Sequence, residues 1–389
     1  MKEYKIDNRW SIHSYYTISP YAPDKSGRLL LSGADLETGI GEVYILGADG
    51  KVLDRFGKNR VFSPFYHTGF WQTWSHDAKT VFYQAGTPDK PKIAAYDTIS
   101  GRNVEMPGDM EGAPPFDMPV LSGLMGMIYA CGYADGKYHP ENAPVPFGER
   151  DRHGIFENNV YKNTSELKLS INDIIRCAGM EEKFAALDRD VEKRLGKGEL
   201  MTLMAYCVRW NRQGDRFLFY FGNHCTDRKR REENITMIFT GKRDFSELRL
   251  ALDLSGKKSC HWSWHPDGRR IIGYAETDNK VCLCSVNCDG SDFHKISNND
   301  TCGHPSICCA DHNLLVTDNY EKTGKVQLID LQTDSVIREF CVPRVFGDIE
   351  PRGRNPYRIC NHPCFSEDGK KLIVNALPNS FARLWEFEL

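Results

Sequence analysis

Short apolar runs recur along this chain, and each follows an extended segment that ends in a polar turn. In the clearest unit, His261 begins the extended segment, Pro266, Asp267 and Gly268 form the turn, and residues 271–274 are apolar or aromatic apart from one glycine. Proline, aspartate and glycine favour tight turns because each restricts or permits particular backbone angles. The unit therefore predicts a β-hairpin.

The same unit recurs along the chain. At several places an apolar run begins ten residues after the start of an extended segment. Most intervals between starts are roughly 43 to 58 residues, the length of a four-stranded blade with its loops. Together the starts predict an all-β chain folded as a seven-bladed β-propeller. The starts are Ser19, Trp71, a weaker copy near Asp117, Cys207, His261, His304 and His362.

We expect residues 1–389 to form a single propeller domain with two insertions in its third repeat. One insertion, about residues 133–153, is rich in proline, glycine and charge. The other, about residues 180–198, has apolar residues at helical spacing and predicts a short helix. The last strand, within residues 382–388, is expected to pair with the N-terminal sequence, because ring closure removes exposed sheet edges.

Composition narrows the class of partner. The 50 basic and 53 acidic residues give a net charge of −3, which favours neither nucleic acid nor a membrane surface as a partner. No apolar run approaches the roughly 20 residues of a membrane helix. Residues 1–7 lack the apolar core of a signal peptide. With 14 cysteines and no Cys-x-x-Cys pair, we expect reduced thiols, a cytoplasmic location, and a monomer or small homo-oligomer.

Three histidines occupy one position in successive repeats. His261, His304 and His362 each stand three residues before an apolar anchor. In a propeller this position lies near the central channel, on the face where the innermost strands begin, so the three imidazoles should converge there. Converging neutral imidazoles suit a divalent metal, Zn²⁺ or Mn²⁺ in preference to Ca²⁺. The alternative is that the histidines only bond to one another and to water.

Several other residues are candidates for the same channel. His224, in a loop of the fourth repeat, is a candidate fourth ligand, with Cys207 and Cys302 as rivals. Basic side chains near the repeat starts would attract an anionic sugar, although each also fits an ordinary surface or salt-bridged arginine. These residues are Arg209, Arg354 and Arg358.

A second group combines a histidine, a tyrosine and an arginine. His67 precedes the Trp71 repeat, Tyr133 opens the first insertion, and Arg150 follows Tyr133 after 17 residues. Arginine pairs with a carboxylate and stabilises the enolate that forms when the adjacent carbon loses its proton. Tyrosine or histidine then moves the proton. The alternative is a solvated loop without catalytic function.

Three segments carry a resemblance to a known family: residues 15–20 (Tyr-Tyr-Thr-Ile-Ser-Pro), residues 65–69 with 72–75, and residues 361–363 with 365–369. They resemble the propeller-type polysaccharide lyases, ulvan lyases in particular and oligogalacturonate lyases more distantly. The resemblance implies β-elimination on an anionic, uronate-containing oligosaccharide. It further implies catalysis by His67, Tyr133 and Arg150, and a metal bound by the repeat-start histidines.

One departure from ulvan lyases leaves alternatives open. Those enzymes have a second active-site histidine about 20 residues after the first, where residues 84–88 here read Gln-Ala-Gly-Thr-Pro. Related propellers act on rhamnose linked to glucuronate, some as hydrolases that use a histidine on the opposite face, a role open to His13 or His139. The rivals to a lyase are thus a rhamnosidase-like hydrolase on the same fold and a non-catalytic binding propeller.

Overall fold

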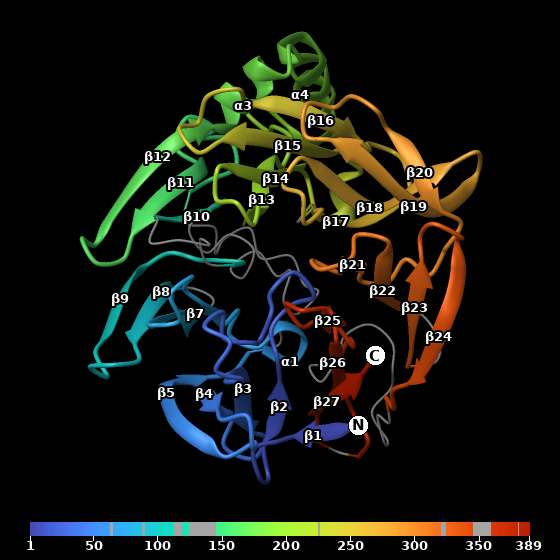
Figure 1. Cartoon of the computed structure of the whole chain (residues 1–389). Helices are drawn as coiled ribbons and strands as arrows, with labels where there is room; N and C mark the ends of the chain where they lie inside the picture. The colour runs from blue at the N-terminus through green and yellow to red at the C-terminus, as the bar shows by residue number, and fades with distance from the viewer. Residues whose placement is uncertain are drawn as a thin grey trace.

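In the computed structural model the chain forms seven β-sheets arranged radially around a central axis (Figure 1). The structure describes residues 1–62, 65–87, 90–112, 119–123, 145–224, 226–319, 324–344, 359–379 and 381–389. The sheets follow one another round the ring in chain order, so each repeat of the sequence forms one blade. The predicted all-β, seven-bladed propeller is confirmed.

Each blade is an antiparallel sheet whose first strand lies nearest the axis. The first three blades consist of β2 (Trp10–Ile12), β3 (Leu29–Asp35), β4 (Ile40–Leu46) and β5 (Val52–Arg60); β6 (Thr73–Trp74), β7 (Thr80–Thr87), β8 (Lys90–Asp97) and β9 (Asn103–Pro107); and the described strands β10 (Val120–Ser122), β11 (Gly154–Asn159) and β12 (Thr164–Ser170). The next three consist of β13 (Met204–Trp210), β14 (Arg216–Gly222), β15 (Thr236–Lys242) and β16 (Arg249–Asp253); β17 (Ser259–Trp264), β18 (Arg270–Thr277), β19 (Lys280–Asn287) and β20 (His294–Ser297); and β21 (Ser306–Ile307), β22 (Leu314–Asp318), β23 (Lys325–Asp330) and β24 (Ser335–Cys341).

The seventh blade joins the two ends of the chain. Its strands β25 (Cys364–Phe365), β26 (Lys371–Ala376) and β27 (Arg383–Glu388) are completed by β1 (Lys2–Tyr4) from the N-terminus. β1 runs antiparallel to β27, with Lys2 opposite Glu386 and Tyr4 opposite Leu384. The two termini therefore lie side by side (Figure 1). This pairing confirms the predicted closure of the ring, because the N-terminal strand β1 supplies the outer strand of the seventh blade.

The turn chemistry seen in the sequence forms the predicted hairpins. In the fifth blade, Asp267 Oδ1 accepts hydrogen bonds from the backbone amides of Arg269 and Arg270, at 2.9 and 3.0 Å. Gly268 has φ +70°, a left-handed conformation that glycine adopts without steric cost. The apolar strands on either side then bury side chains between adjacent sheets, as Leu30 and Val43 of the first blade do with Val81 of the second.

The first blade departs from the repeat. Its innermost strand starts at Trp10, not at Ser19 as the ten-residue offset predicted. After Ile12 the chain leaves the sheet, and pairing resumes where the amide of Leu30 donates to the carbonyl of Pro20 at 2.9 Å. Residues 13–19 thus form an excursion from an otherwise continuous strand. The prediction was wrong because the offset recognised only the second half of this interrupted strand.

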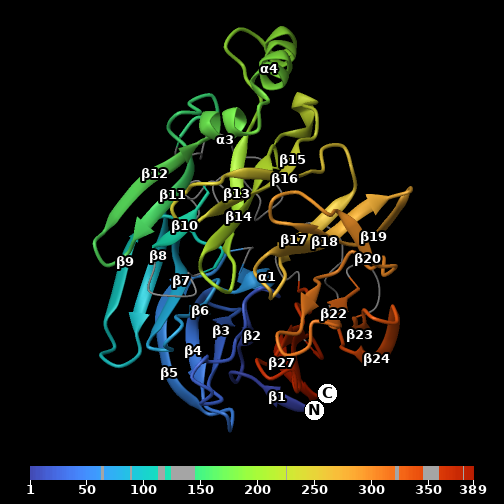
Figure 2. The same ribbon diagram turned by 45° about the horizontal axis from the view of Figure 1, so that its top comes forward.

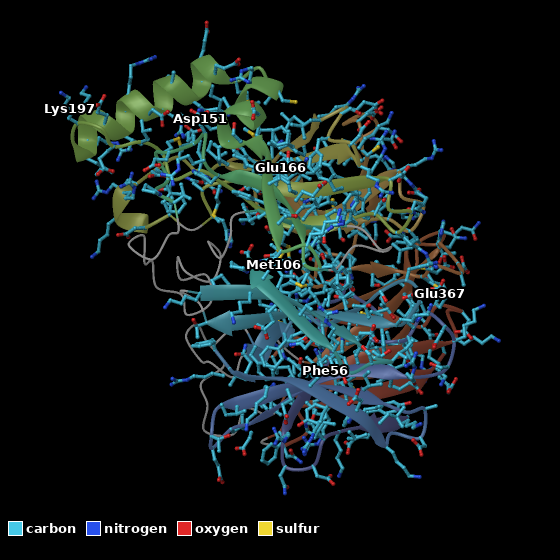
Figure 3. The ribbon with its side chains drawn as sticks, turned by 90° about the vertical axis from the view of Figure 1, so that its left-hand side faces the viewer. Phe56, Met106, Asp151, Glu166, Lys197 and Glu367 are labelled. Atoms are coloured by element: carbon cyan, nitrogen blue, oxygen red, sulfur yellow. The ribbon has the colours of Figure 1, made fainter. Side chains whose placement is uncertain are left out.

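Helices occur outside the sheets. α3 (Ile171–Cys177) and α4 (Glu181–Leu195) connect the third blade to the fourth and extend from the rim of the ring (Figures 2 and 3). α4 confirms the helix predicted for residues 180–198, and it buries Phe184 and Val191. The first insertion, about 133–153, is described only from residue 145 onward. Among the described residues, no helix has the length and apolar character needed to cross a bilayer.

Candidate metal centre

A repeated β-bulge shapes the centre of the ring. In the fourth and fifth blades, three residue steps on the innermost strand oppose two on its neighbour, from Tyr206 to Arg209 and from Cys260 to Ser263. The second and seventh blades have the same bulge. There, too, backbone hydrogen bonds and strand pairing place three residue steps of the innermost strand opposite two of its neighbour. In each bulge one non-glycine residue has a positive φ, and these residues are Trp71 (54°), Cys207 (52°), His261 (58°) and His362 (44°).

Positive φ is unfavourable for residues with a Cβ, and such residues concentrate at functional sites where the surrounding structure holds them in place. A bulge also redirects a side chain out of the strand's regular alternation. Here the excursion at residues 13–19 supplies what the redirected side chains contact. Tyr15 lies 4.7 Å from the His362 ring and 5.3 Å from Trp71, and Tyr16 lies 6.1 Å from His261, measured between ring centroids.

The histidines converge beside this tyrosine pair. The His304 ring lies 4.1 Å from His261 and 4.4 Å from His362, and His67 lies 4.7 Å from His362, all between centroids. His67 comes from α1 (Phe65–Thr68), the short helix that precedes the second blade. The structure thus brings together the three repeat-start histidines and adds His67 to them.

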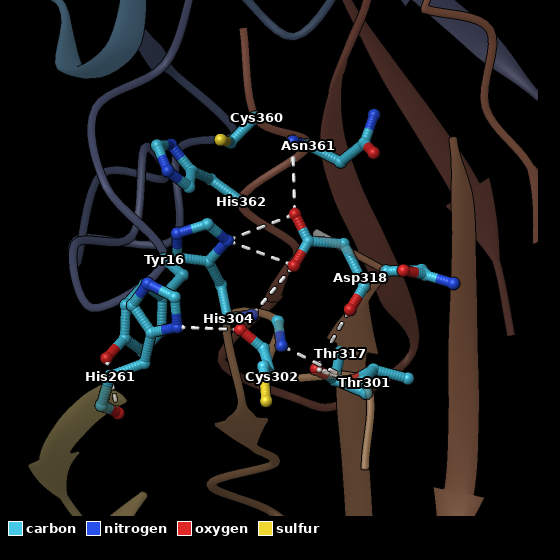
Figure 4. A network of polar contacts seen from close by, with 12 residues as sticks. Tyr16, His261, Thr301, Cys302, His304, Thr317, Asp318, Cys360, Asn361 and His362 are labelled. Atoms are coloured by element: carbon cyan, nitrogen blue, oxygen red, sulfur yellow. Dashed lines mark hydrogen bonds and ion pairs between the residues drawn. The ribbon is translucent and has the colours of Figure 1, made fainter. Parts of the chain in front are cut away.

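Four side chains of this group offer ligand atoms within reach of one ion. A nitrogen of His67, His304 and His362 and the sulfur of Cys360 all lie within 4.8 Å of one another. Cys360 and His362 are two residues apart on the segment leading into β25, and His362 is the residue of this segment that has a positive φ. Figure 4 shows Cys360, His304 and His362 around the same space. We call these four residues the His/Cys cluster.

Hydrogen bonds to the outer nitrogens fix which ring nitrogen faces inward. His304 Nδ1 lies 3.0 and 3.1 Å from the two carboxylate oxygens of Asp318, and His362 Nδ1 lies 3.2 Å from the carbonyl oxygen of Ser14. Both partners are acceptors, so each Nδ1 carries the proton and each Nε2 keeps its lone pair. The His362 Nε2 is buried without a hydrogen-bond partner among the described residues. This arrangement matches that of metal-binding histidines.

Burial keeps the imidazoles of His362 and His261 neutral. Desolvation, followed by the neighbouring histidines, lowers the pKa of His362 well below its ordinary value. The pKa of His261 is lowered to about 4, again chiefly by burial, although the charge of Asp318 opposes the shift. Burial also raises the pKa of Asp318, offset by the amide of His304, which donates to Oδ1 at 2.7 Å. Neutral imidazoles are the form that coordinates metals.

The donor set fits a divalent transition metal. Three imidazoles with one thiol suit Zn²⁺, since thiolate ligands favour Zn²⁺ over the harder Mn²⁺, while imidazole suits both. Ca²⁺ prefers oxygen ligands, and the cluster itself contains none. The ligands would be His67, His304, Cys360 and His362, with Asp318 as the supporting acceptor. His261 was also predicted as a ligand; its ring lies 4.1 Å from that of His304, but it is not one of these four residues.

Other predicted residues lie elsewhere. His224 does not join the cluster, because its ring stacks on Tyr206 at 5.2 Å and the remaining ligand positions are taken by His67 and Cys360. Cys302, the rival ligand, instead contributes its carbonyl oxygen to His261 Nδ1 at 3.0 Å. These two assignments are corrected by the structure.

Arg150 is likewise remote from the cluster. Its guanidinium forms a two-pronged ion pair with Asp188 of α4, at 2.7 and 2.8 Å, and the Arg150 side chain is only 8% exposed. In both ribbon views α4 lies at the rim, whereas α1 lies near the axis (Figures 1 and 2). Arg150 therefore attaches the helical insertion to the ring, and the structure does not bring it to the His/Cys cluster.

Of the remaining candidates, two are buried near the channel and the others lie outside the described residues. Arg209 is buried in the channel, where it donates to the carbonyl of Trp262 at 2.9 Å and lies 5.3 Å from the Tyr15 ring. His13 is also buried, with Nε2 at 2.8 Å from the His362 carbonyl. Four predicted residues lie outside the described part of the chain, namely Tyr133, His139, Arg354 and Arg358.

Sequence reasoning missed two features of the centre. Cys360 had a signal, since it is a possible metal ligand only two residues before a repeat-start histidine. The excursion that carries Tyr15 and Tyr16 had none, because the repeat pattern does not show that a strand is interrupted. His67 was assigned to proton transfer, yet its position places it among the candidate ligands.

Comparison with known proteins agrees with this architecture. No family model matches the sequence, and no curated protein is significantly similar to it. Among solved structures, an oligogalacturonate lyase in complex with manganese is similar over 98% of this chain and 90% of its own, with a TM-score of 0.65 and 13% identity. The oligogalacturonate lyase of Vibrio parahaemolyticus is similar over 99% and 92%, with a TM-score of 0.64 and 12% identity.

The fold is shared more widely than with lyases. The β-propeller domain of the Trilobed protease from Pyrococcus furiosus is similar over 98% of this chain and 96% of its own, with a TM-score of 0.52 and 8% identity. At these identities the likeness establishes the fold alone. Of the two lyase resemblances seen in the sequence, the solved structures include the oligogalacturonate lyases, and the resemblance to ulvan lyases stays a prediction.

Proposed function

We propose that this protein is a metal-dependent lyase that cleaves uronate-containing oligosaccharides by β-elimination. The observation that carries the proposal is the buried His/Cys cluster at the axis of a propeller that matches manganese-bound oligogalacturonate lyase over nearly its whole length. A purely structural role would not require His304 and His362 to hold their Nδ1 protons outward, on Asp318 and Ser14, and to keep the lone pairs of their Nε2 atoms.

The proposed reaction breaks two bonds of the substrate. A base removes the proton from the carbon next to the uronate carboxylate, a carbon–carbon double bond forms, and the glycosidic oxygen on the following carbon leaves and is protonated. The double bond is conjugated with the carboxylate. Positive charge at the carboxylate is the main requirement, since it stabilises the enolate.

A divalent cation held by the cluster would supply positive charge for the carboxylate. His304 and His362 would hold the ion, while Asp318 orients His304 and the Ser14 carbonyl orients His362. We assign His67 to this ligand set in place of its predicted proton-transfer role. Tyr133 is proposed for proton transfer, with Arg354 and Arg358 proposed as substrate-binding residues, on the basis of their sequence positions.

The test is to incubate the purified protein with a panel of uronate substrates: oligogalacturonate, ulvan oligosaccharide and rhamnosyl-glucuronate. We expect ultraviolet absorbance to rise with one of them, because only elimination produces the conjugated unsaturated uronate. Release of a saturated sugar without this absorbance would instead identify a hydrolase. No release from any substrate would contradict an enzymatic function on these glycans.

A further inference from the structure

The end of the channel away from the His/Cys cluster opens into a cavity of about 470 Å³. It is lined by residues that end the innermost strands, among them Trp74 of β6, Trp264 of β17 and Phe365 of β25. The cluster residues His304 and His362 instead precede their strands. The cavity and the cluster thus lie at opposite ends of the innermost strands, and the volume suits a small molecule.

Two buried charged residues line this cavity without pairing with each other. Arg209 and Glu111 are each 9% exposed. Arg209 Nε and Glu111 Oε2 have no hydrogen-bond partner among the described residues, while other atoms of these side chains interact with Tyr16 and Cys207 respectively. Burial raises the pKa of Glu111, and the nearby charge of Arg209 opposes that shift. Buried charged groups with unused hydrogen-bonding atoms are costly unless something binds them.

Three tryptophans are among the residues that line the cavity. Trp74, Trp210 and Trp264 are the last residues of three innermost strands, so three blades contribute an indole at the same level of the ring. Two of these indoles are held in place, since Trp74 Nε1 donates to the Pro20 carbonyl at 3.0 Å and Trp264 Nε1 donates to the Arg209 carbonyl at 3.1 Å. The buried Nε1 of Trp210 has no partner among the described residues.

We propose that this cavity is a second binding site that takes one pyranose sugar ring. A sugar hydroxyl both donates and accepts, so neighbouring hydroxyls can donate to Glu111 and accept from Arg209 at the same time. The apolar face of the ring packs on an indole, and other hydroxyls reach the unpartnered Trp210 Nε1. A simple anion would meet the Glu111 carboxylate, and a simple cation would meet the Arg209 guanidinium.

The second site is separate from the candidate metal centre. Of the aromatic pair in the channel, Tyr16 lines the cavity and also packs on His304 at 5.2 Å between centroids. None of the four residues of the His/Cys cluster lines the cavity. Binding here therefore requires no metal, and the proposal does not depend on the proposed lyase activity.

The test is a titration of intrinsic tryptophan fluorescence with glucose, galactose, rhamnose and glucuronate. We expect at least one sugar to give a saturable change in the wild-type protein. Glu111→Gln keeps the shape of the side chain and removes its charge, so it should weaken that binding about tenfold, the loss expected for a hydrogen bond to a charged group. Retention of fold is checked by circular dichroism.

Trp385→Phe is the matched control, because this indole lies on β27, donates to Glu3 and does not line the cavity. It should leave the binding constant unchanged. Should Glu111→Gln fail to fold, Trp210→Phe carries the same test and should also weaken binding. The proposal is overturned if no sugar gives a saturable change, or if the folded cavity variant binds as tightly as the wild type.

Discussion

The Nδ1 of His304 lies within 3.1 Å of both carboxylate oxygens of Asp318, and both residues are almost completely buried. The same carboxylate accepts from the amides of His304 and Asn361, so it is fixed in place from two directions (Figure 4). A carboxylate in this position holds one tautomer of the imidazole and directs its Nε2 into the His/Cys cluster.

Asp318→Asn should therefore weaken metal binding without removing a ligand. The expected loss is about 10- to 100-fold in affinity, because the amide accepts the imidazole proton less strongly and carries no charge. Competition with a chelator of known affinity measures the change. Asp311→Asn in an exposed turn of the same blade is the control. Wild-type affinity in the Asp318 variant would show that His304 does not bind metal.

Cys360→Ser should change which metal is preferred. Loss of the thiol should reduce Zn²⁺ affinity by more than about tenfold, since losing a ligand exceeds the effect of losing a supporting contact. Mn²⁺ affinity should fall much less, because Mn²⁺ gains little from sulfur. Metal content after equilibration with both ions measures this preference, with the exposed Cys341→Ser as control. An unchanged Zn²⁺ to Mn²⁺ ratio would remove Cys360 from the ligand set.

Arg150→Met should destabilise the fold and leave the chemistry intact. The variant leaves Asp188 without its cation, and breaking a buried ion pair costs about 3 kcal/mol. Equilibrium unfolding in denaturant measures the free energy. The exposed pair of Arg152 with Glu149 offers a matched control, for which Arg152→Met should cost less than about 1 kcal/mol. Lost turnover in a stable Arg150 variant would restore the catalytic assignment made from sequence.

His265 should make the protein less stable in acid. Burial lowers its pKa from 6.5 to about 4, so between these values the unfolded chain binds a proton that the folded protein does not. Stability should fall as the pH decreases from 6.5 to 4. In His265→Gln the loss of melting temperature over this range should be smaller than in the wild type, while the exposed His294→Gln should leave it unchanged. Equal acid sensitivity in all three proteins would contradict the assignment.

The repeat pattern predicted the fold well because each blade is a local unit. Hairpins such as the one around Asp267 are specified by turn residues and apolar runs within about 15 positions, which sequence shows directly. The meeting of His261, His304 and His362 followed from the same argument, since equivalent positions in a ring share one axis. Closure by β1 followed from the need to cover an edge.

The repeat pattern could not predict the contacts made by segments that interrupt the repeat. Tyr15 and Tyr16 reach the channel because residues 13–19 leave the strand, a tertiary event without a periodic signal. Arg150 was chosen for its spacing from Tyr133, but its partner Asp188 lies 38 positions further on, in a helix whose docking is not visible in sequence. His67 is placed among the ligands by a single helical turn, which spacing does not predict.

The most direct test of the central claim is whether elimination depends on metal held by this cluster. The rate of unsaturated-uronate formation would be followed by ultraviolet absorbance with the substrate identified from the panel. It would be measured for the protein as purified, after chelation, after return of Zn²⁺ or Mn²⁺, and for His362→Ala. We predict that chelation abolishes the reaction, that one metal restores it, and that His362→Ala stays inactive with metal added. Full activity in the chelated protein or in His362→Ala would contradict the account.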